Sequence, residues 1–299
     1  MAYPSDVVVL DFDALVHARL SRDGKSLRID QAKSYRLPAD TFTSAVVTPE
    51  LTGEAGLAET LRRLRMETGR WDKVSLLLPD AWFRINIIDL PSLPERTHEA
   101  EQIIRWSLKR TIPLDPSAIR VAFEVLAKSP QTRVLAVSAV EETLAALERV
   151  FGAAGFEVNL IEPVGLNIWN AVAVREHTTT RDRVFIYVRE NDFTTAVFRG
   201  AQPLFVRSRN LSGDRTIEQE IRLSANYVRD TFQASNVENC YLAGNGTASE
   251  TMQSLAEVLR SEFSAPVHIV ALRDVITRVP DGVAAHDAEL TACTGVFTA

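Results

Sequence analysis

The chain has 299 residues, of which 46% are hydrophobic and 24% charged, a balance typical of a globular protein with a sizeable core. Its formal net charge of -6 argues against a broad basic surface, so we expect no nucleic-acid partner. The two cysteines, Cys240 and Cys293, are far apart, and neither they nor the five histidines form a metal-ligand motif. We therefore expect no metal centre.

The N-terminus lacks the basic region and long apolar run of a signal peptide. No apolar run approaches the roughly twenty residues that a membrane helix needs. We expect a cytoplasmic protein that reaches a membrane only through its partners.

The chain opens with a three-strand pattern. Val7–Leu10 is a continuous apolar run that fits a buried strand, and Ala14–Leu20 alternates apolar and polar residues. Asp23-Gly24 predicts a hairpin turn, after which Leu27–Tyr35 returns as a third strand. A helix opened by Thr48-Pro49-Glu50 follows.

The stretch Leu90–Pro113 is the most informative segment. Two prolines end a strand that begins at Trp82, and a helix follows with one apolar face and Lys109 near its end, where the helix dipole favours cations. This stretch predicts an inserted subdomain at about 82–160, within a first lobe that covers residues 1–180.

The opening pattern recurs in the second half, as strands at Val184–Val188, Phe193–Phe198 and Pro203–Arg209. Two copies of one pattern predict two related lobes, and the polar run His177–Asp182 marks their boundary, so the second lobe covers 181–299. The remaining expected strands are Val74–Leu78, Ile119–Leu126, Arg133–Ser138, Glu157–Ile161, Cys240–Leu242 and Val267–Val270. The remaining expected helices are Glu141–Phe151, Pro163–Val174, Ile217–Phe232 and Ser249–Phe263, with His286–Phe297 as a helix or a closing strand.

An ordered set of short motifs runs along almost the whole chain: Leu76-Leu77-Leu78-Pro79, Leu90-Pro91, Ile112-Pro113, Ala154-Gly155-Phe156 through Glu162-Pro163, Phe205-Val206-Arg207 through Leu211-Ser212-Gly213, and Leu242-Ala243-Gly244-Asn245-Gly246. This set resembles the PilM family of type IV pilus assembly, within the actin-like ATPases. FtsA and the cytoplasmic part of GspL share parts of the plan. The resemblance implies an α/β fold class: a two-lobed actin-like (ribonuclease H-like) fold with an inserted α/β subdomain in the first lobe.

The resemblance also implies two phosphate loops, and both depart from the family's pattern. Where the family has Asp-apolar-Gly, hydroxyl residues and a Lys, this chain has Asp11-Phe12-Asp13, with His17 near the Lys position. The carboxylate of Asp13 therefore faces the place of an anionic phosphate. Where the family has Asp-Ile-Gly, this chain has Tyr187-Val188-Arg189, so the metal-orienting carboxylate is missing, although Arg189 could attract phosphate.

The later loops keep the family's pattern better, and one of them stands where the family contacts the adenosine. The candidate nucleotide-binding residues are Asp11, Asp13, Gly213, Asp214, Gly244, Asn245 and Gly246. They leave two interpretations open: binding of ATP and Mg²⁺ with slow hydrolysis, or remnants that serve turns. We favour the second, a pseudo-ATPase that requires no cofactor. No other catalytic set stands out, since no serine has a G-x-S-x-G setting and neither cysteine has a nearby base.

An inserted subdomain beside the first lobe makes a groove that suits a peptide. The resemblance implies that the groove takes the N-terminal cytoplasmic tail of PilN, a single-pass membrane protein, and that signals pass on to cytoplasmic pilus motor ATPases. The expected lining residues are Trp82, Phe83, Arg84, Ile85, Arg105, Trp106 and Lys109. The alternative for Trp82 and Trp106 is that they cover the subdomain's own core.

The expected function is a non-catalytic cytoplasmic scaffold, peripheral to the inner membrane, in the platform of a type IV pilus or a related secretion machine. One alternative is a working actin-like ATPase of the FtsA type, for which intact Asp-x-Gly loops would be expected. Another is a GspL-like domain, which would continue into a membrane helix after Ala299.

Overall fold

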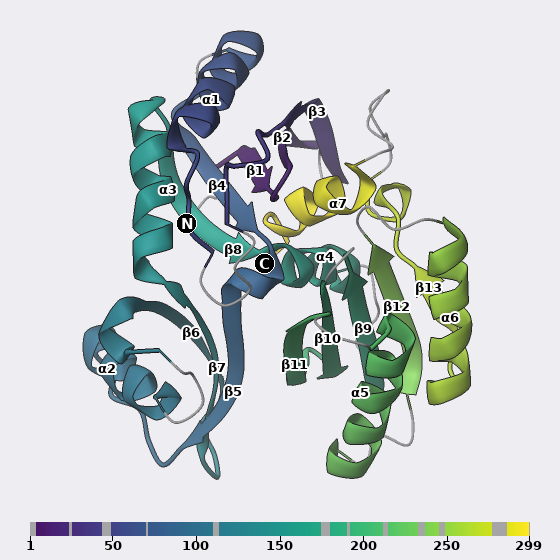
Figure 1. The fold of residues 1–299 in the computed structure, drawn as a ribbon. Coiled ribbons are helices and arrows are strands. Elements are labelled where there is room, and N and C mark those ends of the chain that lie inside the picture. The colour runs from purple at the N-terminus through teal and green to yellow at the C-terminus, as the bar shows by residue number, and fades with distance from the viewer. Residues whose placement is uncertain are drawn as a thin grey trace.

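The computed structural model is a mixed α/β protein with three sheets, arranged as two lobes and a smaller subdomain (Figure 1). The structure describes residues 4–23, 26–43, 49–69, 71–109, 114–174, 180–189, 192–211, 215–232, 237–244, 249–276 and 286–298. Within these ranges, no helix combines the length and the apolar character needed to cross a membrane.

The first lobe is built on a five-stranded sheet in the order β3-β2-β1-β4-β8. Its strands are β1 (Asp6–Leu10), β2 (Ala14–Asp23), β3 (Ser26–Arg36), β4 (Lys73–Leu78) and β8 (Glu157–Pro163). The first three form an antiparallel meander, while β4 and β8 extend the sheet in parallel to β1. Every residue of the central strand β1 is buried, which explains its continuous apolar run. Helices α1 (Glu54–Thr68) and α3 (Glu141–Ala153) flank this sheet.

The second lobe repeats the same topology, in the order β11-β10-β9-β12-β13. Its strands are β9 (Asp182–Val188), β10 (Asp192–Arg199), β11 (Gln202–Asn210), β12 (Val237–Gly244) and β13 (Val267–Ile269). Helices α5 (Ile217–Phe232) and α6 (Ser249–Phe263) cover one face. The predicted repeat is therefore confirmed strand by strand. Pro203 lies in β11, at the edge of this sheet, where proline is tolerated better than in a central strand.

The inserted subdomain is a three-stranded antiparallel sheet in the order β5-β7-β6, covered by one helix. Its elements are the 3₁₀ helix η1 (Asp80–Trp82), β5 (Phe83–Leu90), α2 (Thr97–Leu108), the 3₁₀ helix η2 (Pro116–Ala118), β6 (Ile119–Ala127) and β7 (Thr132–Val140). Ile104 and Leu108 of α2 pack on the sheet in a small separate core. The expected insert reached about 160, but β8 pairs with β4 of the first-lobe sheet. Pro113 lies outside the described residues.

Two helices link the lobes by crossing over. Helix α4 (Val164–Ala173) follows the first-lobe sheet, yet its Trp169 stacks on Phe198 of the second lobe at 4.1 Å between ring centroids. Helix α7 (Asp287–Gly295) lies near the chain end, yet it packs against α4 and against β1 and β2 of the first lobe. The expected boundary of the second lobe, 181–299, therefore includes a helix that contacts the first lobe. The segment 286–297 forms a helix, not a closing strand.

The first helix starts later than predicted. Thr48 lies outside the described residues, and α1 begins at Glu54 rather than near Pro49. The reason is tertiary: Leu51 pairs with Phe42 across an isolated antiparallel bridge. The N–H groups of Thr52 and Gly53 donate to the carbonyl of Thr41 at 3.0 and 3.1 Å, which holds this segment extended up to the helix.

Candidate functional site between the lobes

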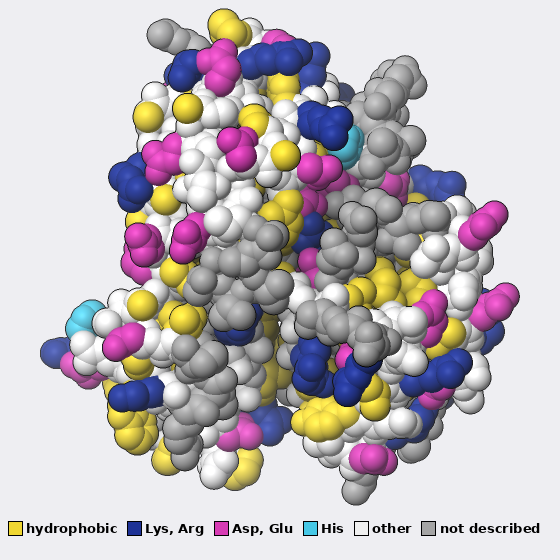
Figure 2. Space-filling model, in the orientation of Figure 1, with side chains coloured by type: hydrophobic (Ala, Val, Ile, Leu, Met, Phe, Trp, Pro, Cys, Tyr) yellow, Lys and Arg dark blue, Asp and Glu magenta, His cyan; other side chains and the backbone are white. Residues whose placement is uncertain are grey.

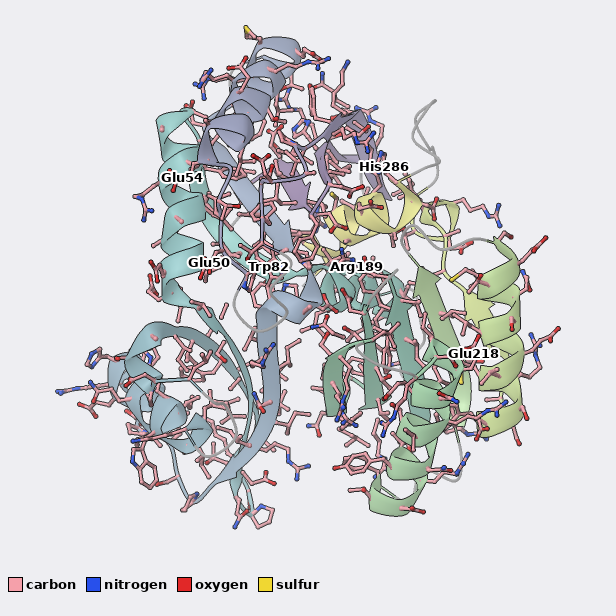
Figure 3. All side chains as sticks on the ribbon, viewed as in Figure 1. Glu50, Glu54, Trp82, Arg189, Glu218 and His286 are labelled. Carbon is pink, nitrogen blue, oxygen red and sulfur yellow. The ribbon has the colours of Figure 1, made fainter. Side chains whose placement is uncertain are left out.

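Two equivalent hairpin turns face each other between the lobes. Asp11 begins the turn after β1, and Arg189 begins the turn after β9. Since β1 and β9 hold the same central place in the two sheets, their carboxyl ends point into the same cleft, where sheets of this kind bind ligands. Figure 3 places Arg189 at this junction, near Trp82 of the first lobe. Basic and acidic side chains occur together in the recess between the upper and right-hand lobes (Figure 2).

The guanidinium group of Arg189 bridges these turns. Its Nη2 atom donates to Asp11 Oδ1 across the cleft, and its Nη1 atom donates to Asp192 Oδ2 at 3.0 Å within the second lobe. The guanidinium carbon also lies 5.8 Å from the centre of the Phe12 ring. The three charged side chains are only 10%, 14% and 7% exposed for Arg189, Asp11 and Asp192. This inter-lobe ion pair is therefore largely shielded from solvent.

A third carboxylate, Asp80 of η1, is fully buried nearby. Its Oδ1 atom accepts the N–H of Gly165, at the start of α4, at 2.7 Å. Burial raises the pKa of Asp80, against the opposing effects of Thr194, Gly165 and Arg189. Burial likewise raises the pKa of Asp11, although Arg189 lowers it. For Asp11, Asp80 and Asp192, burial thus outweighs the attraction of Arg189, so the pKa of each carboxyl is raised.

The guanidinium of Arg189 stays charged in this setting. Burial alone would lower its pKa, but the charges of Asp11, Tyr187, Asp192 and Asp80 outweigh burial, so the pKa is raised. The C-terminal helix α7 adds further titratable groups. Glu289 is buried, its charge raises the pKa of Asp11, and its Oε1 atom lies 3.3 Å from His286 Nδ1.

Three backbone N–H groups of the two turns form hydrogen bonds within the protein. Phosphate loops offer free backbone N–H groups, but here the N–H of Asp11 donates to Ala14 O at 2.8 Å and that of Phe12 to Asp11 Oδ1 at 2.6 Å. In the facing turn, the N–H of Arg189 donates to Asp192 O at 2.8 Å. The guanidinium of Arg189 already pairs with Asp11. In the described ranges, no group of three potential ligand side chains could hold a metal ion.

The structure brings together some of the predicted nucleotide residues. Asp11 and Asp13 share the β1–β2 turn, and Gly244 ends β12 beside Val188 of β9, so all three are at the cleft. Gly213, Asp214, Asn245 and Gly246 lie outside the described residues. Arg189 does reach the cleft, but its guanidinium group already forms ion pairs with Asp11 and Asp192.

His17, which we placed near the family's Lys position, does not face the cleft. It is fully buried on β2, where its Nε2 atom lies 2.8 Å from Asp6 Oδ1 and its ring stacks on Trp71 at 4.8 Å between centroids. Burial lowers its pKa, although the hydrogen bond to the Asp6 carboxylate raises it. The physical reason is strand alternation, since one position along a strand reverses the direction of the side chain.

The sequence reasoning missed Asp80 and Asp192. Asp192 carried a local signal, because it stands three residues after Arg189 across a hairpin turn. Asp80 carried none, since only the packing of η1 against α4 and β10 brings it to the cleft.

The predicted partner-binding residues divide into two groups. Trp82, Phe83 and Ile85 are only 5%, 4% and 9% exposed and belong to the main core, so they do not line an open surface. The indole of Trp82 packs edge-on against Phe42 and Phe12 at 5.0 and 5.9 Å between centroids. Arg84, Arg105, Trp106 and Lys109 retain exposure, and Trp106 is 71% exposed. Trp82 is therefore a core residue, but of the main core and not of the subdomain's own core, and Trp106 covers neither.

Arg84 is a cation without an acidic partner in the described part of the chain. It lies where the insert joins the first lobe, and its Nη1 atom donates only to the carbonyls of Ala81 and Phe83, each at 3.0 Å. Burial lowers its pKa, with no charge opposing the shift. Arg105 of α2 pairs with Glu101 one turn earlier at 3.8 Å, and its charge also acts on Glu141 of α3. Its buried Nε atom has no hydrogen-bond partner among the described residues.

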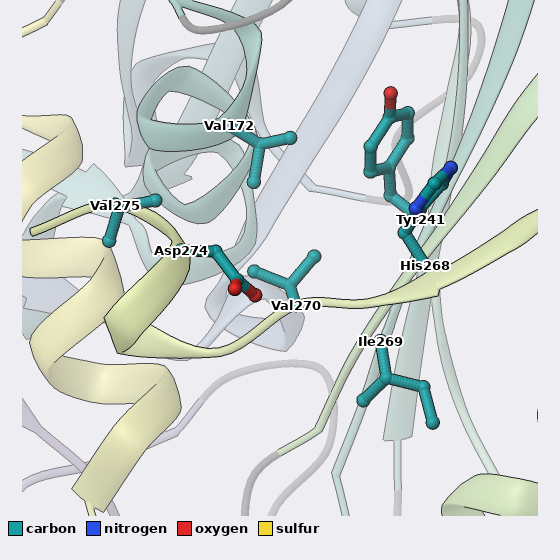
Figure 4. A pocket seen from close by; sticks show the side chains of 7 residues that line it. All are labelled: Val172, Tyr241, His268, Ile269, Val270, Asp274 and Val275. Carbon is teal, nitrogen blue, oxygen red and sulfur yellow. The ribbon is translucent and has the colours of Figure 1, made fainter.

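A separate cavity of about 310 Å³ lies between α4 and the edge strand β13 (Figure 4). It is lined by Val172, Tyr241, His268, Ile269, Val270, Asp274 and Val275. The rings of Tyr241 and His268 stack at 5.3 Å between centroids. No residue of the cleft or of the predicted partner set contributes to this lining.

The substitution Asp192→Asn is expected to change how stability depends on pH. Burial raises the pKa of Asp192 to about 6, although Arg189 lowers it. Because the folded state binds this proton more tightly than the unfolded state, the stabilisation is present at low pH and is lost as pH rises toward about 6. The stability of the wild type minus that of Asp192→Asn should therefore fall by on the order of 2 kcal/mol between about pH 4 and pH 7. Urea unfolding across this range measures it, and a constant difference would contradict the assignment.

Comparison of the sequence with protein-family models and with curated proteins finds no match. Solved structures do match. A chain of a PilM–PilN type IV pilus biogenesis complex is 20% identical, with 96% of each chain covered and a TM-score of 0.78. A Bacteroides thetaiotaomicron protein with an actin-like ATPase fold and unknown function is 11% identical, with 98% of this chain and 95% of that chain covered and a TM-score of 0.60. The cytoplasmic domain of EpsL, an inner-membrane component of the Vibrio cholerae type II secretion system, is 12% identical, with coverage of 98% and 94% and a TM-score of 0.53. The fold is therefore the two-lobed actin-like fold expected from the sequence.

Proposed function

We propose that this chain, with its actin-like fold and inserted subdomain, is a cytoplasmic scaffold in the inner-membrane platform of a type IV pilus or a related secretion machine. It binds the N-terminal cytoplasmic tail of a PilN-like single-pass membrane protein. The proposal is supported by the match to a chain of the PilM–PilN complex, which extends over 96% of both chains and so includes the inserted subdomain. The match to the cytoplasmic domain of EpsL supports the same kind of setting.

The observation that carries the tail-binding part is the state of Arg84. Among the described residues, this partly buried guanidinium bonds only to backbone carbonyls and has no acidic partner, which such groups normally have. Arg105 of α2 has a buried Nε atom with no hydrogen-bond partner among the described residues. A peptide lying between the insert and the first lobe would supply carboxylate or carbonyl acceptors to both groups. Trp106 and Lys109 extend the exposed surface along α2.

The same proposal includes a pseudo-ATPase. Its support is that Arg189 pairs with Asp11, and that the N–H groups of Asp11, Phe12 and Arg189 are already bonded within the protein. The scaffold then needs no cofactor, stays peripheral to the inner membrane through its partners, and passes assembly signals to cytoplasmic motor ATPases.

Replacing Arg84 with glutamate is expected to weaken binding of the tail at least about tenfold, since a charged hydrogen-bonded pair contributes about 1.5–3 kcal/mol. The measurement is fluorescence anisotropy with a labelled peptide that copies the N-terminal cytoplasmic tail of a PilN-like protein from the same organism. The matched control is Arg133→Glu, on β7 of the same sheet, because Arg133 already pairs with Asp89 at 2.8 Å on the surface. Equal affinities for Arg84→Glu and the wild type would remove Arg84 from the site.

Two outcomes would overturn the function itself. A wild-type protein that does not bind the tail at micromolar peptide is not this scaffold. A wild-type protein that binds Mg-ATP with micromolar affinity in isothermal titration, and turns it over, is instead an actin-like ATPase of the FtsA type.

A further inference from the structure

The ion pair between Arg189 and Asp11 joins residues 178 positions apart and crosses from one lobe to the other. Residues of both lobes hold the guanidinium group of Arg189 in position. Asp192 holds the guanidinium at 3.0 Å from within the second lobe, and Phe12 lies beneath it at 5.8 Å in the first. The contact therefore has fixed geometry, as is expected of a buried pair and not of a chance surface contact.

The cleft needs a cation at this point. Asp11 belongs to the first lobe, Asp80 to η1 where the insert begins, and Asp192 to the second lobe. Carboxylates from both sides of the cleft therefore come together with little solvent. Like charges in such a setting repel strongly and push apart the elements that carry them. The side chain of Arg189 supplies the opposite charge from within the chain.

We propose that Arg189 is a built-in cation that holds the two lobes closed through Asp11, so that closure of the cleft depends on neither nucleotide nor metal. This inference rests on the pseudo-ATPase part of the proposed function. It adds that Arg189 takes over the role of the lost nucleotide and metal in closing the cleft. The platform component then presents one fixed shape to its partners. The tail-binding part does not depend on it.

Other contacts between distant segments fit a closed arrangement. The side chain of Gln202, on β11, donates to the carbonyl of Leu126, on β6, at 3.2 Å, and so ties the second lobe to the insert. The edge strands β5 and β11 also lie side by side. These contacts join the insert to the second lobe, whereas the inter-lobe ion pair lies where the central strands β1 and β9 end.

The test measures the distance between the lobes. Spin labels on cysteines introduced at Met66 of α1 and Leu223 of α5 suit it, because these side chains are 76% and 47% exposed, while Cys240 and Cys293 are buried. Pulsed electron paramagnetic resonance is recorded on the labelled wild type, on Arg189→Ala and on Asp11→Asn, each with and without Mg-ATP. Asp11→Asn is nearly isosteric and breaks the same bond from the other lobe, so it serves if Arg189→Ala does not fold.

The wild type should give one narrow distance distribution that Mg-ATP does not change. Arg189→Ala and Asp11→Asn should each broaden it or shift its mean by more than about 2 Å, the scale of hinge rearrangements. The matched control, Arg199→Ala, breaks the pair of Arg199 with Asp182 inside the second lobe, at 2.7 Å, and should leave the distribution unchanged.

A wild-type distribution in both Arg189→Ala and Asp11→Asn would overturn the inference, as would a wild type whose lobes move closer on addition of Mg-ATP. Tail binding measured on the same proteins separates the two proposals. If Arg189 does not hold the lobes closed, the wild type still binds the tail. If the scaffold function is wrong, the tail fails to bind whatever the inter-lobe distances are.

Discussion

Replacing Gly295 with alanine is expected to destabilise the protein by about 3 kcal/mol or more. Gly295 ends α7 where this helix crosses α4, and an added Cβ atom would lie 1.8 Å from the carbonyl oxygen of Asn167. The obstacle is backbone and cannot rotate away. Asn167 is itself fixed, since its amide donates to Glu162 Oε2 at 2.9 Å and to Pro163 O at 3.1 Å. The two helices would have to separate, and with them the crossing that links the lobes.

The measurement combines urea unfolding with the reactivity of Cys293. This thiol lies on α7, is fully buried, and has its pKa raised by burial, so it should react slowly with a thiol reagent in the wild type and faster in Gly295→Ala. Gly152→Ala is the matched control. No atom lies within 4 Å of its added Cβ, and alanine in a helix should stabilise by up to about 1 kcal/mol. Equal unfolding midpoints for Gly295→Ala and Gly152→Ala would contradict the close crossing of α7 and α4.

The second large effect is expected for Trp82→Ala, at about 3–5 kcal/mol of lost stability. Trp82 is 5% exposed and packs against Phe12 and Phe42, where the insert joins the first lobe. Removing the indole leaves a cavity among aromatic rings that cannot collapse freely. Trp82→Phe should cost less, because it keeps the ring contacts and removes a buried Nε1 atom for which the described residues provide no hydrogen-bond partner.

Trp106→Ala is the matched control on the same subdomain. With 71% of Trp106 exposed, its removal should change stability by no more than about 0.5 kcal/mol. Unfolding in urea, followed by circular dichroism, measures both variants. A loss for Trp106→Ala as large as that for Trp82→Ala would mean that α2 is covered in solution by a surface that the isolated chain does not provide.

Most of the fold could be predicted because the strands are long, apolar and bounded by clear turn residues. Val7–Leu10 and Val184–Val188 could be recognised as equivalent from their composition alone, and the two sheets have the same strand order. The start of α1 and the end of the insert differ from the prediction, because tertiary contacts set them. The bridge between Phe42 and Leu51 delays α1, and the pairing of β8 with β4 shortens the insert.

The candidate site could be predicted only in part. The sequence showed that Asp13 and Arg189 replace residues typical of phosphate loops, and hence that the cleft is altered. It could not show that Arg189 bonds with Asp11, because hydrogen bonding between residues 178 positions apart depends on how two lobes close. For the partner surface, Trp and Arg were chosen by residue type, which does not distinguish a covered indole from an exposed one.

The sequence by itself determined the repeated lobe pattern, the inserted helix of Leu90–Pro113 and the loss of the usual phosphate-loop residues, since periodicity, prolines and glycines act locally. Only the tertiary structure decided which groups the charged side chains contact. Whether Arg189 faces solvent, a phosphate or a carboxylate depends on the relative position of β1 and β9, and the energy of a charge depends on burial and neighbours rather than on its place in the chain. For the same reason Trp82 lies in the core and Trp106 lies on the surface.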